Sequence, residues 1–136
     1  MTANDAWEAL LGAHARLMKQ FAAEDVWEGL AMREYDVLYT LSKCPEPQRI
    51  GELSHHVLLS QPALSRMVDR LVAKGLVERC PDPADGRGVR LALTAAGREL
   101  QRTIGLRHAR GVARALRERL TEEELHQLEV IGRKLA

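Results

Sequence analysis

The chain has 136 residues and a formal net charge of +1, and this length suits a single domain that can bury a modest core. No apolar run approaches the length of a membrane span, and the N-terminus lacks the basic and then apolar pattern of a signal peptide. We therefore expect a soluble, cytoplasmic protein with no membrane partner, whose two cysteines form no disulfide framework.

The small net charge hides an uneven distribution along the chain. Residues 1–58 sum to −4, residues 59–97 to +2, residues 98–119 to +5 and residues 120–136 to −2. A nucleic-acid binder needs positive charge gathered on one side rather than a large total. The second half of the chain has such a concentration, although residues 98–119 also fit the solvated face of a helix.

The first predicted element is an amphipathic helix over residues 4–22, because its apolar side chains recur at helical spacing. They are Trp7, Leu10, Leu11, His14, Leu17, Met18 and Phe21.

A helix-turn-helix is predicted further along, from two short helices joined by a tight connection. The first helix is built on Ile50, Leu53, Val57 and Leu58, and the connection is Leu58-Leu59-Ser60.

The second helix of this pair has strong end signals. Ser60 can cap it, Pro62 is tolerated in its first turn, and Gly75 ends it. Its apolar stripe consists of Leu64, Met67, Val68, Leu71 and Val72. Taken alone, such a stripe favours an ordinary amphipathic surface helix, and the neighbouring elements shift the interpretation towards a recognition helix.

The opposite face of the second helix carries side chains suited to DNA. Its first turn offers small or amide side chains for base edges, and two arginines can reach guanine or phosphate. The predicted contacts here are Ser60, Gln61, Ser65, Arg66 and Arg70, with Ala63 also exposed in the first turn.

A β-hairpin is predicted next, with strands over residues 76–80 and 89–93 and a turn-rich loop between them. Arg87 lies near the tip, where an arginine on a thin hairpin can enter a minor groove, and Asp85 can hold its guanidinium in place. Arg90 is a candidate phosphate contact. The alternative is a solvated loop with a local ion pair that contributes little.

Two helices complete the chain. Thr94 is predicted to cap a long helix that ends near Leu120, and Thr121 with Glu124 has capping-box spacing before a last helix. The stripe of the last helix is Leu125, Leu128, Ile131 and Leu135.

A winged helix needs little more than residues 30–94, so the helices over residues 4–22 and 95–135 bury their stripes against a second copy or back on their own domain. A homodimer is favoured, because reading two half-sites needs two recognition helices related by a twofold axis.

These motifs closely resemble the MarR family of bacterial transcription regulators, over nearly the whole chain. The segments that carry the resemblance are Gly51-Glu52-Leu53, Gln61 to Leu71, Gly75 to Arg79, Asp82 to Arg87 and Leu93 to Gly97. The most specific part is the Asp85-x-Arg87 wing followed by Leu93-Thr94-x-x-Gly97. The resemblance implies a triangular dimer with interleaved terminal helices, and a small aromatic, usually anionic, effector bound between these helices and the DNA-binding lobe.

The predicted fold is therefore one domain over residues 1–136, mainly α with a small β-hairpin wing: a winged helix-turn-helix with N- and C-terminal dimerisation helices. The predicted function is sequence-specific regulation of transcription, as a repressor released from a pseudo-palindromic operator by a small ligand. The expected partners are double-stranded DNA, a second copy and this effector. Candidate ligand-binding residues are Trp7, His14, Trp27, Tyr35 and Tyr39, each of which can also be a core residue.

Other functions fit the sequence less well. No enzyme is predicted, because neither a nucleophile elbow nor a phosphate-binding glycine motif is present. No metal or cofactor is predicted, since His108 has no histidine one turn away and the adjacent His55 and His56 would diverge on a helix. Three alternatives stay open: a protein-interaction module, an effector-free structural DNA binder, and a redox-responsive regulator acting through Cys80, although inert thiols are favoured for Cys44 and Cys80.

Overall fold

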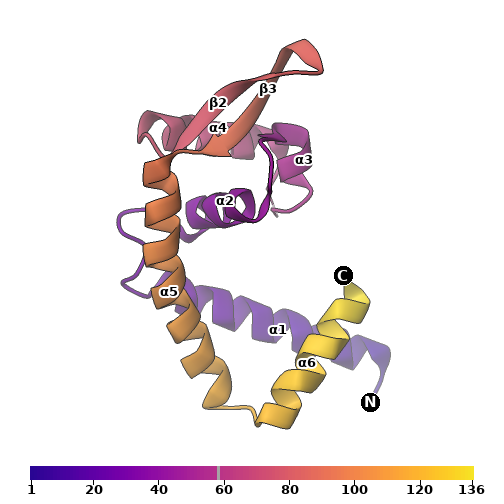
Figure 1. Ribbon diagram of the computed structural model, residues 1–136. Helices are drawn as coiled ribbons and strands as arrows, with labels where there is room; N and C mark the ends of the chain where they lie inside the picture. The colour runs from indigo at the N-terminus through magenta and orange to yellow at the C-terminus, as the bar shows by residue number, and fades with distance from the viewer. Residues whose placement is uncertain (58) are drawn as a thin grey trace. The chain divides into compact units, whose positions relative to one another are not determined.

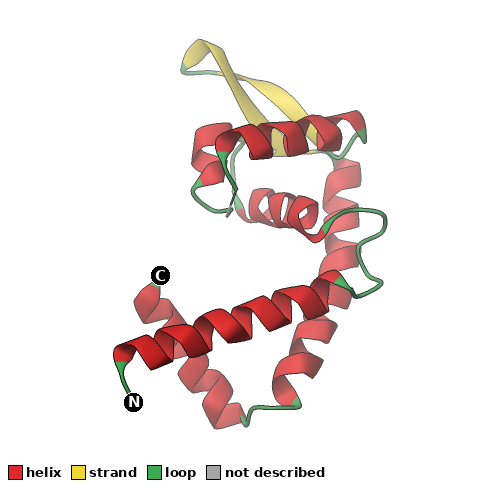
Figure 2. Ribbon diagram, turned by 180° about the vertical axis from the view of Figure 1, so that it is seen from behind, coloured by secondary structure: helices red, strands yellow, loops and turns green. Residues whose placement is uncertain are grey.

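The computed structural model describes residues 1–57 and 59–136, and its elements are mainly helical (Figures 1 and 2). In chain order they are α1 (Ala3–Ala22), α2 (Met32–Lys43), β1 (Gln48–Arg49), α3 (Ile50–Ser54), α4 (Gln61–Ala73), β2 (Val77–Asp82), β3 (Asp85–Leu93), α5 (Ala95–Arg117) and α6 (Glu122–Leu135). Leu58, which the sequence places in the connection between two helices, lies outside the described residues. Among the described residues, no helix combines the length and the apolar character needed to cross a bilayer.

The chain divides into two compact units. One consists of Met1–Asp25 and Leu106–Ala136, and the other of Val26–Gly105. Helix α5 contributes to both units because the division falls within it. The unit Val26–Gly105 holds α2, α3, α4 and the three strands.

The core of Val26–Gly105 forms where the apolar faces of its helices meet the sheet. Side chains from α2, α3, α4, β2 and the first half of α5 are shielded from solvent there. The largest of them are Val37, Leu38, Leu53, Leu64, Leu71, Val77 and Ile104. The predicted stripe of α4 faces this core: four of its five members are buried, and Val72 is half-buried.

Helix α4 begins and ends as the sequence predicts. The Ser60 hydroxyl accepts a hydrogen bond of 3.3 Å from the Ala63 backbone N–H, and Pro62 lies in the first turn. Gly75 follows the helix with φ +73°, a left-handed conformation that favours glycine. The cap and the glycine fix both ends of the exposed face.

The hairpin differs from the prediction, because its strands are longer and its loop is shorter. Strand β2 extends to Asp82 and β3 begins at Asp85, so the turn is confined to residues 83 and 84. The sheet order is β1-β3-β2, so β2 is an edge strand, where the proline at position 81 is tolerated. The register shifts between Pro81 and Asp82, and this irregularity accommodates the residues predicted as loop. Figures 1 and 2 show the hairpin extending beyond the helices of its unit.

Before α4, the sequence does not predict the short strand β1, and it predicts a longer helix than α3. Strand β1 has only two residues, which pair with β3 as Gln48 with Leu91 and Arg49 with Arg90. Helix α3 ends at Ser54, so Val57 is buried outside the helix that was predicted to include it. A two-residue strand is too short to show an alternating pattern in the sequence.

The Leu93-Thr94-x-x-Gly97 motif joins the sheet to α5. The Thr94 hydroxyl donates to the Gly75 carbonyl (2.7 Å) and accepts from the Gly97 backbone N–H (3.0 Å). The Thr94 backbone N–H donates to the Leu76 carbonyl (3.1 Å). A Cβ atom on Gly97 would lie 2.0 Å from that carbonyl oxygen, so only glycine fits. The motif therefore fixes the start of α5 on the turn that follows α4.

The unit formed by Met1–Asp25 and Leu106–Ala136 has a small core and a large apolar surface. Phe21 is buried, and its ring meets His108 edge-on at 5.3 Å between centroids. Thr121 caps α6 in the predicted capping box with Glu124. No residue of α6 is buried. The large exposed apolar side chains of α1 and α6 are Trp7, Leu10, Leu11, Leu128, Val130, Ile131 and Leu135.

Candidate nucleic-acid interface

The outer face of α4 is polar and exposed. The predicted contact residues Ser60, Gln61, Ser65, Arg66 and Arg70 are all solvent-exposed, while Leu64 and Leu71 on the other face are fully buried. Asp69 lies on the exposed side and forms an ion pair with Arg79 of β2. The helix therefore presents two arginines and a small polar first turn to solvent.

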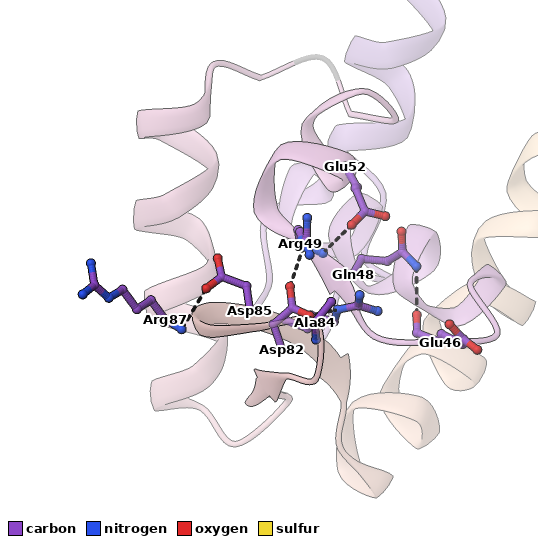
Figure 3. Close-up of polar contacts among 9 residues, drawn as sticks. Glu46, Gln48, Arg49, Glu52, Asp82, Ala84, Asp85 and Arg87 are labelled. Carbon is purple, nitrogen blue, oxygen red and sulfur yellow. Dashed lines mark hydrogen bonds and ion pairs between the residues drawn. The ribbon is translucent and has the colours of Figure 1, made fainter.

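The second exposed feature of this unit is the hairpin, which carries Arg87. The structure differs from the prediction in the role of Asp85, whose carboxylate accepts from the Arg87 backbone N–H (3.0 Å) instead of the guanidinium. A carboxylate reaches the N–H two residues further along the chain easily, as in an Asx-turn. Figure 3 shows the Arg87 side chain extending away from Asp85. The turn is thus stabilised by Asp85, and the guanidinium stays exposed.

A buried carboxylate, Asp82, lies at the base of the hairpin and forms ion pairs with two arginines, and Figure 3 shows it facing one of them, Arg49. Its side chain has 0% exposure; Oδ2 lies 2.5 Å from Arg49 Nε and Oδ1 lies 3.2 Å from Arg90 Nε. Oδ1 also accepts from the Ala84 backbone N–H (2.9 Å). The hydrogen bond from Arg49, followed by that from Ala84, holds the pKa of Asp82 below its ordinary value. The same bond to Asp82 raises the pKa of Arg49.

Neither Asp82 nor Arg49 is predicted as a site residue from the sequence. Asp82 is the last residue of β2, next to the turn, where an aspartate is common, so its residue type gives no signal of burial. Its partner Arg49 lies 33 positions away, and no local pattern connects the two. Arg90, predicted as a phosphate contact, is ion-paired with Asp82 and its side chain is only 22% exposed. Its contact with phosphate remains a prediction.

The five candidate ligand-binding residues fall in two different units. Trp27, Tyr35 and Tyr39 belong to Val26–Gly105, with ring centroids 5.4 Å apart for the first pair and 6.1 Å for the second. Trp27 and Tyr35 are core residues, and burial is the main cause that raises the pKa of Tyr35, whereas Tyr39 is exposed. Trp7 and His14 lie on α1, where both are exposed. Trp7 lines a hollow of about 550 Å³ with residues of α6.

Neither cysteine pairs with the other, and both thiols are half-buried. The Cys44 thiol donates to the Thr40 carbonyl at 3.3 Å, at the end of α2. Cys80 lies within β2, opposite Arg90 in the register.

His55 and His56 are exposed after α3, and the described residues include no cluster of three or more potential metal ligands.

This architecture is shared with proteins of known family. The model of the MarR family matches residues 28–88. The multiple antibiotic resistance protein MarR of Salmonella typhimurium is 36% identical over 84 residues, which is 62% of this chain and 58% of that protein. The structure of AbsC, a MarR family transcriptional regulator from Streptomyces coelicolor, superposes with a TM-score of 0.83 at 27% identity, covering 99% of this chain and 93% of that one. The chain is thus similar to MarR-family regulators in both sequence and fold.

The similar MarR-family structures include one that was solved with DNA bound. This second Streptomyces coelicolor regulator, solved in complex with DNA, gives a TM-score of 0.81 at 29% identity over 99% of this chain and 87% of that one. The match to the Salmonella relative covers less than two thirds of that protein's length. The predicted fold class, a mainly α winged helix-turn-helix with a small sheet, is confirmed.

Proposed function

We propose that this protein is a MarR-family regulator of transcription, which binds DNA sequence-specifically and represses from a pseudo-palindromic operator. One observation carries the proposal: a single compact unit presents both the exposed polar face of α4 and a projecting hairpin with an exposed arginine. These are the elements with which a winged helix reads a major groove and the adjacent minor groove. The similarity to a DNA-bound regulator supports it.

Each exposed side chain has a role that follows from its chemistry. Gln61 and Ser65 can bond base edges from the first turns of α4, with Ser60 at the cap. Arg66 and Arg70 can bind guanine in a bidentate manner or contact phosphate. Arg87 enters the flanking minor groove, whose negative potential attracts a guanidinium.

The proposed regulator acts as a homodimer. A pseudo-palindromic operator requires two copies of α4 related by a twofold axis. The exposed apolar side chains of α1 and α6 form a surface of the kind that marks a protein–protein interface. We propose that α1 and α6 of a second copy pack against this apolar surface.

A small aromatic anion is the proposed effector. It would bind one conformation of the dimer better than the other and shift the population away from the DNA-binding form. Of the candidate residues, Trp7, His14 and Tyr39 are exposed enough to meet a ligand. The probe is benzoate, titrated into a preformed complex with DNA. Release of DNA is expected, and an unchanged affinity would favour the effector-free DNA binder.

The decisive experiment is the selection of preferred duplexes from a random pool. The expected product is a twofold-symmetric site. Arg66→Ala should then weaken binding to that site by about 1–3 kcal/mol and relax the preference at one position, at fixed salt concentration. Arg133→Ala on α6, where the arginine is paired with Glu129, removes the same charge and serves as the control. Binding without sequence preference would contradict the proposal and favour a protein-interaction module.

A further inference from the structure

The buried carboxylate of Asp82 is a polar feature of Val26–Gly105 that is not among the proposed DNA contacts. Removing a carboxylate from water is unfavourable unless charges and hydrogen bonds compensate for it. At Asp82, two arginines and one backbone N–H supply that compensation, and the side chain has no exposure. The cost of burying the charge is thus offset by contacts that also join separate segments of the chain.

The groups that contact Asp82 come from different parts of the unit. Arg49 lies where β1 meets α3, and its backbone N–H also donates to Glu52 of α3 (3.4 Å). Arg90 lies in β3, and Ala84 lies in the hairpin turn. Asp82 ends β2, and Figure 3 shows its side chain and that of Arg49 pointing toward each other. Since α3 packs against α4, this Arg49–Asp82–Arg90 cluster ties the hairpin to the helix-turn-helix.

The outer part of the hairpin has little support beyond this cluster, because the ion pair between Arg79 of β2 and Asp69 of α4 lies nearer the start of β2 than Asp82 does. Strand β1 supports β3 only as far as the pair Arg49 and Arg90. Further out, residues 83–87 are exposed and Val89 is 49% exposed, so no apolar core supports the two strands. An unsupported two-stranded hairpin is marginally stable in water. The polar cluster at its base is therefore the structure's main means of directing the outer hairpin.

We propose that Asp82 is a positioning residue for DNA recognition. Held by Arg49 and Arg90, it sets the offset between the bases read by α4 and the minor-groove position reached by Arg87. This inference rests on the proposed function, and it adds that the Arg49–Asp82–Arg90 cluster determines specificity at the flanking positions of each half-site.

The test uses Asp82→Asn in the full-length protein. The amide oxygen still accepts from Ala84, but the charge is lost and an NH₂ group faces Arg49. Duplex selection with this variant should keep the preference at the positions read by α4 and broaden the preference at the flanks. Affinity for the parent's site should fall by at least about fivefold, in the range expected when an arginine contact is lost. The matched control is Glu99→Gln, which removes the same charge from an exposed pair with Arg102 on α5.

A double-mutant cycle with Arg87→Ala separates positioning from general damage. If Asp82 acts through Arg87, Asp82→Asn should have little further effect once Arg87 is alanine. Hydrogen exchange without DNA adds an independent readout: amides of residues 85–89 should exchange faster in Asp82→Asn, while those of α4 stay unchanged. If Asp82→Asn does not fold, Arg49→Gln removes the pairing from the other side and should give the same pattern.

The outcomes distinguish this inference from the proposed function. Additive losses in the cycle, or an unchanged flanking preference with unchanged hairpin exchange, would overturn the positioning role while DNA recognition stands. A parent protein that selects no duplex from the pool would overturn both.

Discussion

At the scale of single residues, the structure explains why particular residue types are required at positions that belong to a sequence motif. Gly97 is one of them, because its Cα faces the backbone carbonyl of Leu76 rather than a movable side chain. A methyl group there needs the turn after α4 or the start of α5 to shift. The resemblance to the MarR family identified this glycine, and the carbonyl contact explains it.

We expect Gly97→Ala to lower the free energy of unfolding by about 1–3 kcal/mol or more, the usual cost of overpacking. Urea denaturation measures the change. Gly12→Ala on α1 is the control, because a Cβ there meets nothing within 4 Å. The control should be neutral or more stable by up to about 1 kcal/mol, as alanine is the better helix former. Equal stability of Gly97→Ala and the parent would show that the close approach is absent in solution.

Asp82 gives a prediction about acid stability. Its pKa is lowered in the folded protein from an ordinary value of 3.8, mainly by the hydrogen bond from Arg49. A carboxyl whose pKa falls on folding stabilises the native state above its unfolded pKa, and this stabilisation is lost as pH falls through the folded pKa. The stability difference between the parent and Asp82→Asn should thus stay constant down to pH 3.8 and shrink below it. Thermal unfolding across this range measures it, and a difference that persists through the acid range would contradict the prediction.

The exposure of the polar residues of α4 could be predicted, whereas the Asp82 cluster could not. Arg66 and Arg70 lie off an apolar stripe of period 3.6, so their exposure follows from local spacing. The meeting of Asp82 with Arg49 depends on β1 pairing with β3, a contact between segments far apart in the chain. Local spacing carries no information about such a contact.

At the scale of elements, end signals were the most reliable guide. Ser60, Gly75 and Thr121 mark helix ends in the structure as they do in the sequence. The strands were predicted less well, because proline and glycine were taken as loop signals. In an edge strand with a register shift these residues are compatible with pairing, so the hairpin is longer than predicted.

The cap of α4 leads to a prediction about that helix. Ser60→Ala removes the acceptor for the Ala63 N–H and should lower the free energy of unfolding by about 1 kcal/mol. Ser60→Asp keeps an acceptor at the cap and should restore most of that stability. Urea denaturation of the two variants measures the effect. Equal stability of the alanine and aspartate variants would show that the cap contributes nothing.

At the scale of the whole molecule, the sequence identified apolar faces but not what covers them. The stripes of α1 and α6 were predicted from spacing, and both helices form as expected. In the single chain, Ile131 is 54% exposed and Leu135 is 72% exposed. A pattern along one chain predicts that a face is apolar, whereas its partner depends on the assembly. Homodimerisation through these helices is therefore a prediction to be measured.

Ile131→Glu places a charge on the apolar face of α6 and should convert the proposed dimer to a monomer, because an unpaired carboxylate is strongly disfavoured in an apolar interface. Sedimentation velocity measures the change in mass. The control is His126→Glu, which adds the same carboxylate on the polar side of the same helix and should leave the dimer intact. The monomeric variant should also lose its preference for symmetric over half-site duplexes, since each half-site is then bound independently. A parent that sediments as a monomer, or an Ile131→Glu protein that remains dimeric, would show that α6 does not hold two copies together.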